Sequence, residues 1–158
     1  MLKHVTSWKI SNKLSTKQRI LVKSFPGAKT AHMEHLVKPT MNEESPKHLI
    51  LHVGTNDLNL NKTPRDIANS IIDTAVKTVK NSRTTLSISG IVTRDDTLKH
   101  QVRQVNNFLR NLCAERNIGF LCHDNIQSNH LNGSRLHLNK QGTKNMIRNF
   151  AVHIEKLH

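Results

Sequence analysis

The sequence predicts an α/β domain built on a parallel β-sheet. Short apolar runs bounded by Pro, Gly or polar residues alternate with longer segments in which apolar residues recur every three or four positions. Strands separated by helices in this way pair in parallel and carry helices on both faces of the sheet. The length of 158 residues suits a single domain, spanning residues 1–158.

Four short apolar segments are predicted to be strands. The clearest is Leu-Ile-Leu-His-Val at 49–53, because an apolar run bounded by Pro46 and Gly54 is typical of a buried parallel strand. The other three predicted strands cover residues 19–25, 86–92 and 118–122. The strand at 19–25 is expected to end where Pro26 and Gly27 follow it.

Helices are predicted between these strands. The helix at 64–80 has the strongest start signal, with Thr63 as N-cap, Pro64 in the first position and Asp66 in the first turn, where the helix dipole favours it. A short helix at 30–37 is expected to stop before Pro39. Longer helices are predicted at 97–116 and from about residue 139 onward.

The composition is strongly basic. The chain has 24 Lys and Arg against 11 Asp and Glu, a net charge of +13 and a pI near 10.3. Such a surface attracts polyanions through counterion release, so nonspecific binding of nucleic acid is expected. Aromatic residues make up only 3%, and no zinc-finger, RRM-type or KH-type motif is present. Sequence-specific recognition is therefore not predicted.

Cysteine and histidine spacing predicts neither a disulfide framework nor a metal site. Cys113 and Cys122 are the only cysteines, which fits a reducing, intracellular location in the cytoplasm or nucleus. His32 and His35 lie one helical turn apart but have no third ligand nearby in the sequence, so we expect them to be solvated. No apolar stretch approaches membrane-spanning length, and no membrane association or cofactor is predicted.

Candidate functional residues follow three of the predicted strands, and ligands of parallel sheets bind outside the carboxyl ends of the strands. Gly27 follows the first, and its backbone N–H can approach a ligand closely. Asn56 follows the second and carries an amide that can donate to an oxyanion. His137 lies in the loop after the last and could act as a general base. Each pattern also occurs in ordinary turns, caps and solvated loops, but together they supply two parts of acyl-transfer chemistry.

Three sequence blocks resemble the SGNH (GDSL-like) hydrolase family. Residues 52–58 (His-Val-Gly-Thr-Asn-Asp-Leu) resemble its G-x-N-D block, and 135–143 (Arg-Leu-His-Leu-Asn-Lys-Gln-Gly-Thr) resemble its final block. Residues 25–28 (Phe-Pro-Gly-Ala) fall where the family places its oxyanion glycine. The likeness extends to esterase-like domains encoded by retrotransposons of aquatic animals, which adds a mobile-element origin as a hypothesis.

The resemblance implies a flavodoxin-like, three-layer α/β/α sheet with strand order 2-1-3-4-5. It also implies a Ser-Gly-Asn-His set of functional residues, in which Gly27 and Asn56 form the oxyanion hole and His137 is the general base. The substrate would be a small ester or thioester, and the reaction would need neither a metal nor an organic cofactor.

Two departures from the family pattern bear on activity. The family's nucleophile lies in a Gly-Asp-Ser motif after the first strand, whereas residues 1–5 resemble the stretch that directly follows that motif. The chain is therefore expected to lack this serine and the first, central strand, which would leave two inner sheet edges unpaired and the chain poorly soluble. Ser134 replaces the aspartate three residues before the catalytic histidine, and a neutral hydroxyl cannot stabilise an imidazolium as a carboxylate does.

Substitute nucleophiles are not predicted. Ser7 and Ser11 lack a strand-turn-helix elbow before them, and Ser87 and Ser89 alternate along a strand as polar strand positions do. Cys122, at the end of the last strand, is expected to be a structural thiol.

Three functions remain open. The first is an ester hydrolase that is active only if a Gly-Asp-Ser segment exists upstream. The second is a catalytically inactive, basic, nucleic-acid-associated module of a mobile-element protein. The third is a fragmentary gene product without function. The oligomeric state is not predicted.

Overall fold

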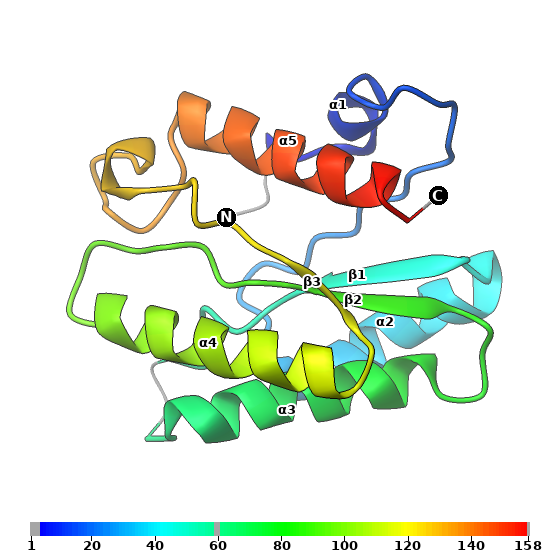
Figure 1. Ribbon diagram of the computed structural model, residues 1–158, viewed down its shortest axis with the longest axis horizontal. Coiled ribbons are helices and arrows are strands. Elements are labelled where there is room, and N and C mark those ends of the chain that lie inside the picture. Colours follow the sequence, from blue (N-terminus) through cyan, green and yellow to red (C-terminus); the bar gives the residue numbers. More distant parts are fainter. Residues whose placement is uncertain (1–3, 59–60, 158) are drawn as a thin grey trace.

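The fold is an α/β sandwich in which helices cover both faces of a small parallel sheet (Figure 1). The computed structural model describes residues 4–58 and 61–157. Residues 1–3, which carry part of the likeness to the stretch after the Gly-Asp-Ser motif, lie outside the described residues. The elements are α1 (Ser7–Ser11), α2 (Thr30–Glu44), β1 (His48–His52), α3 (Pro64–Val79), β2 (Thr85–Ser89), α4 (Lys99–Glu115), β3 (Gly119–Leu121), the 3-10 turn η2 (Ser128–His130) and α5 (Lys140–Glu155).

The described sheet has three parallel strands in the order β1-β2-β3. Leu51 pairs with Ile88, and both point to the face covered by α2, α3 and α4. The opposite face lies under α1 and α5, whose apolar side packs against a second cluster that includes Leu121 and Met146. The predicted parallel sheet with helices on both faces is confirmed (Figure 1).

Helix α3 begins where its capping residues predict. The side chain of Thr63 accepts a hydrogen bond from the backbone N–H of Asp66 at 3.1 Å, and Pro64 occupies the first helical turn. Ile67 and Ile71 are then fully buried on the face toward the sheet. The cap and the four-residue apolar period together fix both the start of the helix and its buried side.

The predicted strand at 19–25 is wrong. This segment is extended but pairs with no strand among the described residues. Its backbone is held by isolated contacts, such as the hydrogen bond from the N–H of Val22 to the hydroxyl of Ser7 at 3.0 Å. An apolar sequence becomes a strand only when a neighbouring edge accepts its backbone hydrogen bonds, and none of the described strands does so for this segment.

The predicted end of the second helix before Pro39 is also wrong, because α2 continues through Pro39 to Glu44. Pro39 lies on the exposed side, so the carbonyl that loses its helical partner faces water. Met33, Val37 and Met41 extend the buried stripe past the proline at four-residue spacing. The packing of this stripe therefore outweighs the single lost hydrogen bond.

The sheet face under α5 carries an unusual polar ladder. The hydroxyl of Ser89 lies 2.9 Å from Nδ1 of His52 and 2.8 Å from Nε2 of His123. The hydroxyl of Ser87 is held in the same way between His48 and His153, at 2.9 and 2.8 Å. Both serines are fully buried, so these side chains form hydrogen bonds where an ordinary core would be apolar.

Candidate active site

The loops that leave the carboxyl ends of β1, β2 and β3 gather at one end of the sheet (Figure 1). They comprise residues 53–58, 90–98 and 122–138. Asn56 lies in the first and His137 in the third. The turn with Gly27 precedes α2 and adjoins the first loop.

Asn56 and the Gly27 turn are in direct contact. The side-chain amide of Asn56 donates a hydrogen bond to the carbonyl of Ala28 at 3.0 Å. Gly27 has a φ of +76°, a conformation that favours glycine, and a side chain at this position would meet nothing within 4 Å. Gly27 and the side chain of Asn56 therefore both adjoin Ala28, and the Asn56 amide retains a second hydrogen that can donate.

Asp57 fixes the Asn56 loop to the start of α2. Its buried carboxylate accepts hydrogen bonds from the backbone N–H of Thr30 at 3.0 Å and from the Thr30 hydroxyl at 2.9 Å. These charge-assisted bonds sit at the positive end of the helix dipole. The loop and the Gly27 turn are therefore held by one buried anchor next to the donors.

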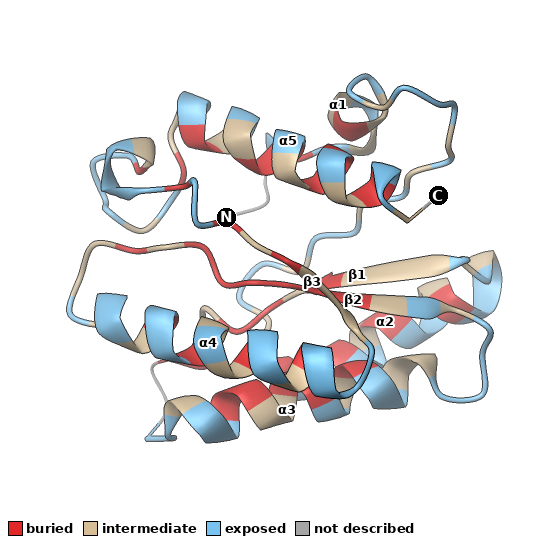
Figure 2. Cartoon of the chain, viewed as in Figure 1, coloured by how far each residue is buried: buried red, intermediate tan, exposed pale blue. Residues whose placement is uncertain are grey.

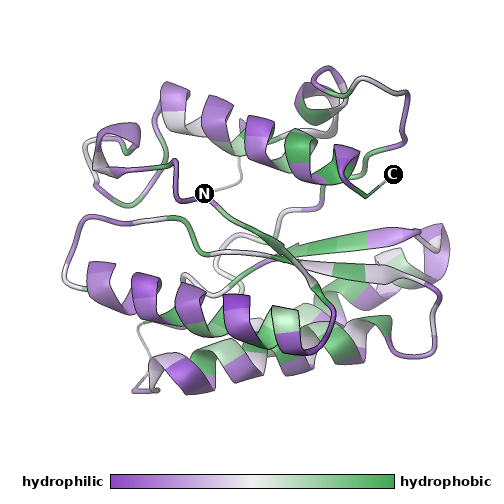
Figure 3. Cartoon of the chain, in the orientation of Figure 1, coloured by the Kyte–Doolittle hydropathy of each residue, from purple (hydrophilic) through white to green (hydrophobic). Residues whose placement is uncertain are grey.

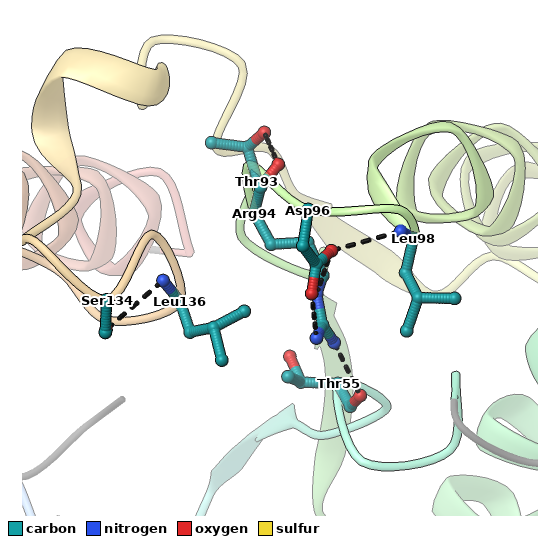
Figure 4. Close-up of polar contacts among 7 residues, drawn as sticks. All are labelled: Thr55, Thr93, Arg94, Asp96, Leu98, Ser134 and Leu136. Carbon is teal, nitrogen blue, oxygen red and sulfur yellow. Dashed lines mark hydrogen bonds and ion pairs between the residues drawn. The ribbon is translucent and has the colours of Figure 1, made fainter.

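Arg94, just after β2, connects the first loop to the second (Figure 4). Its guanidinium, with only 8% of its side chain exposed, binds both carboxylate oxygens of Asp96 at 2.5–3.0 Å. Nη1 also lies 3.5 Å from the carbonyl oxygen of Thr55. The pKa of Asp96 is lowered, chiefly by the hydrogen bond from Arg94.

Asp95 connects the second loop to the loop of His137. Its backbone N–H donates to the carbonyl of Arg135 at 3.0 Å, and its carboxylate lies 3.8 Å from the Arg135 guanidinium. Lys99 also donates to this carboxylate, and that hydrogen bond is the main cause of its lowered pKa. Figure 4 shows the 134–136 segment beside the Arg94 cluster. Through these contacts the three loops form one connected rim.

His137 stands at an exposed position of this rim. Its carbonyl accepts from the backbone N–H of Asn132 at 2.8 Å, beside an antiparallel bridge between Leu131 and Leu138. Within the part of the chain that the structure describes, its ring makes no hydrogen bond. The imidazole is thus presented to solvent on a loop with a fixed backbone.

Ser134 is not brought to His137. Its hydroxyl donates to the side chain of Asn132 at 2.5 Å and lies 3.4 Å from the N–H of Leu136. The hydroxyl closes the loop on itself, so it does not orient the imidazole as a carboxylate in this position would.

Four of the five candidate substitute nucleophiles have structural contacts. Ser7 accepts from Val22, while Ser87 and Ser89 lie buried in the polar ladder. Cys122 is half-buried, and burial raises the pKa of its thiol, which disfavours the nucleophilic thiolate. These contacts give none of the four an activated, exposed position on the rim.

Residues 4–58 and 61–157 contain no group of three or more His, Cys, Asp or Glu side chains placed to hold a metal ion. His32 instead accepts from the backbone N–H of Lys29 at 3.3 Å at the start of α2. None of the described helices is both long and apolar enough to cross a bilayer.

Comparison with known proteins identifies the family. A model of the GDSL-like lipase/acylhydrolase family matches residues 6–144. The chain belongs to this family and is an esterase-like domain of the SGNH fold. The comparison with curated proteins returned no match.

Solved structures share the fold. Est24, a carbohydrate acetylesterase from Sinorhizobium meliloti, matches with a TM-score of 0.76 at 12% identity, over 96% of this chain and 85% of its own. A lipase/acylhydrolase from Enterococcus faecalis matches with a TM-score of 0.74 at 11% identity, over 97% and 86%. The aryl esterase of M. smegmatis gives 0.74 at 10%, over 96% and 85%. At these identities the likeness concerns the fold.

The Asp57 anchor leads to a first prediction. Asp57→Asn is expected to lower the free energy of unfolding by about 2 kcal/mol, because an amide NH2 would face the donors of Thr30 and a charge-assisted bond is lost. Urea unfolding followed by circular dichroism measures this. The matched control is Asp66→Asn, an exposed capping carboxylate, for which a loss below about 1 kcal/mol is expected. Equal losses in the two variants would contradict the role of Asp57 as an anchor.

Proposed function

We propose that the complete domain hydrolyses small carboxylic esters or thioesters by acyl transfer. Gly27 and Asn56 serve as oxyanion donors, and His137 serves as the general base. The observation that carries this proposal is the hydrogen bond from the Asn56 amide to the carbonyl of Ala28, which ties the Asn56 side chain to the turn that contains Gly27. Arg94 and Asp95 link this pair to the loop of His137, which supports a shared site.

We further propose that an upstream segment supplies the nucleophile and that residues 1–158 form a domain lacking its Gly-Asp-Ser motif and first strand. Within the described sheet, β1 pairs with β2 and with no other strand. Ile20 and Val22 of the extended 19–25 segment pack against the same apolar cluster as Ile50 of β1. A strand inserted between the two would pair with both, and its end would point toward the rim. Without it, the chain is expected to be inactive.

In the proposed reaction the upstream serine attacks the acyl carbon, and His137 takes the serine proton at the same step. The carbonyl electron pair moves onto the oxygen, where Gly27 and Asn56 donate hydrogen bonds to the negative charge. His137 then returns the proton to the departing alcohol or thiol, and water repeats the cycle on the acyl-enzyme.

A second candidate function is a catalytically inactive, nucleic-acid-associated module of an intracellular mobile-element protein. The hydroxyl of Ser134, engaged within its own loop, gives His137 no carboxylate support. The net charge of +13 favours polyanion binding. The two free thiols, Cys113 and Cys122, fit a reducing compartment.

An esterase assay separates these functions. With para-nitrophenyl acetate, residues 1–158 alone are expected to hydrolyse the ester no faster than buffer does, whereas a version extended upstream through its reading frame is expected to turn over. In the extended version, His137→Ala should lower kcat by at least about 100-fold, since a general base contributes roughly that much. Ser134→Asp should raise kcat by supporting the imidazolium.

The exposed His100 provides the control, because His100→Ala should leave kcat unchanged. If the extended version is silent, the hydrolase proposal is wrong and the second function gains support. If the extended version is equally active with His137→Ala, the role of His137 as general base is wrong.

A further inference from the structure

The positive charge of the chain is concentrated in its two ends. Residues 1–33 contain seven Lys and Arg and no Asp or Glu, and residues 125–158 contain five Lys and Arg with Glu155 as the only acid. These two segments together carry a net charge of +11. Residues 34–124 carry twelve basic and ten acidic residues, a net charge of only +2.

The two ends come together in the fold. Helix α1 packs beside α5, and both cover the same face of the sheet (Figure 1). Glu155 is occupied within this layer, because its carboxylate accepts from the backbone N–H of Ser15 at 2.7 Å. Of the basic residues of the two ends, Lys9 lies on α1 and Lys140, Lys144 and Arg148 lie on α5, and Glu155 is the only acidic residue on the two helices.

A row of three cations runs along the outer side of α5. Lys140, Lys144 and Arg148 recur at four-residue spacing, so they lie on one side of the helix about 6 Å apart along its axis. All three are exposed, and this side of α5 faces away from the sheet (Figures 2 and 3). Among the described residues, none of them forms an ion pair.

Cations on the other layer are more often neutralised. Arg110 pairs with Asp124 at 3.0 Å, and Arg116 pairs with Asp73 at 3.1 Å. The α5 row differs from these pairs because no acidic side chain occurs between Asp124 and Glu155 in the sequence. Its charges are free to attract an external anion.

The same layer exposes the only tryptophan of the chain. Trp8 on α1 is 71% exposed, although α1 buries Ile10 against the cluster beneath it. Its neighbours Lys9 and Lys13 add positive charge. An exposed aromatic ring among cations is what a base-stacking platform requires, because every base offers a face on which a ring can stack.

We infer that the α1/α5 layer binds single-stranded nucleic acid, with Lys140, Lys144 and Arg148 on the phosphates and Trp8 stacked on a base. The inference deepens the second candidate function proposed above and rests on it, and it does not depend on ester hydrolysis, because helices rather than the rim loops form this surface. A membrane surface fits less well, because only Val152 among the other large apolar side chains exposed on the described residues lies on α5, whereas Leu21 and Val76 lie on other segments.

Fluorescence anisotropy with a labelled 20-mer of oligo(dT) or oligo(U) tests the inference on the chain as it stands. Replacing Lys140, Lys144 and Arg148 together by Gln is expected to weaken binding at least tenfold and to reduce the salt slope by about 2, since each lost phosphate contact removes roughly 0.7. The matched control replaces the exposed Lys77, Lys80 and Arg83 of the other layer by Gln. It has the same change in net charge and should alter binding less than about twofold.

Trp8 gives a second, independent readout. Because it is the only tryptophan, quenching of the intrinsic fluorescence by unlabelled oligonucleotide reports directly on stacking at this residue. Equal losses in the two triple variants would reduce the effect to net charge and overturn the assigned surface. An unquenched Trp8 would remove the stacking role. Equally tight binding to phosphatidylserine vesicles or polyglutamate would overturn the choice of nucleic acid as the partner.

Discussion

Acidification from pH 7 to about pH 4 is expected to remove several kcal/mol of stability through two histidines of the polar ladder between the sheet and α5. His52 and His123 flank the hydroxyl of Ser89 at 2.9 and 2.8 Å, and the other nitrogen of His123 lies 3.0 Å from the side-chain amide of Asn149. His153 on α5 and Asp124 lie close enough to influence the charge of His123. The network joins β1, β2 and α5, so charging it affects the contact between the sheet and its helix layer.

Burial lowers the pKa of His52 to about 4. Burial, and secondarily the charge of His52, lowers the pKa of His123 to about 3. In the unfolded chain both titrate near 6.5. Above pH 6.5 the two histidines are neutral in both the folded and the unfolded chain, so they do not lower the stability. As the pH falls below 6.5, the unfolded state takes up protons first, so stability declines until the folded pKa values are reached.

One pKa unit corresponds to 1.36 kcal/mol, so the lowered pKa of each histidine lowers the free energy of unfolding by about 3 kcal/mol or more on full acidification. The loss for the pair is less than the sum of the two, because the two histidines are coupled. This loss is a large part of the free energy of unfolding of a whole domain, which is about 5–15 kcal/mol. Urea unfolding between pH 7.5 and 4.5 measures it.

The His52→Gln and His123→Gln variants should each show a flatter dependence of stability on pH, whatever their stability at neutral pH. Replacement of the exposed His100 by Gln should leave that dependence unchanged. A stability that is constant between pH 7 and 4.5 in the unmodified chain would show that these histidines do not remain neutral in the fold.

Local patterns predicted most of the fold. The cap at Thr63 and the apolar period of α3 are properties of neighbouring residues, so the helix is found where the sequence predicts it. The strand prediction for 19–25 was wrong because a strand needs an adjacent edge with which to pair, and local sequence does not reveal one. The predicted end of the helix before Pro39 was wrong because the effect of a proline depends on which side of the helix faces water.

In the candidate site, too, local motifs were recognised in the sequence, whereas contacts between distant residues were not. Gly27 and Asn56 were predicted from motifs after two predicted strands, of which only the one before Asn56 is a strand in the structure, and the two loops are in contact through Ala28. The roles of Arg94 and Asp57 were not predicted, because each depends on a residue distant in sequence, Thr55 for the first and Thr30 for the second. The histidine–serine ladder went unpredicted for the same reason, since it forms only when β1, β2 and α5 assemble.

Gly54→Ala is expected to cause the largest loss of stability among single substitutions near the site. Gly54 has a φ of +120°, which is strained for any residue with a side chain, and a methyl group there would lie 2.8 Å from Cδ1 of both Ile71 and Ile91. Overpacking and backbone strain together should cost about 3 kcal/mol or more.

For a domain of this size, that loss corresponds to a decrease in Tm of roughly 10 °C. The substitution should also displace Thr55 and Asn56, so an extended, active version of the chain should lose esterase activity in parallel. Gly133→Ala is the matched control, because its methyl group would meet nothing within 4 Å, and its Tm should stay within about 2 °C.

Adding Ile71→Val to Gly54→Ala removes one of the two clashing methyl groups and should recover part of the loss, although Ile71→Val alone destabilises by about 1 kcal/mol. Such a gain from a substitution that is harmful by itself would identify steric crowding at Gly54 as the cause. Additive losses would instead assign the effect to the backbone conformation alone.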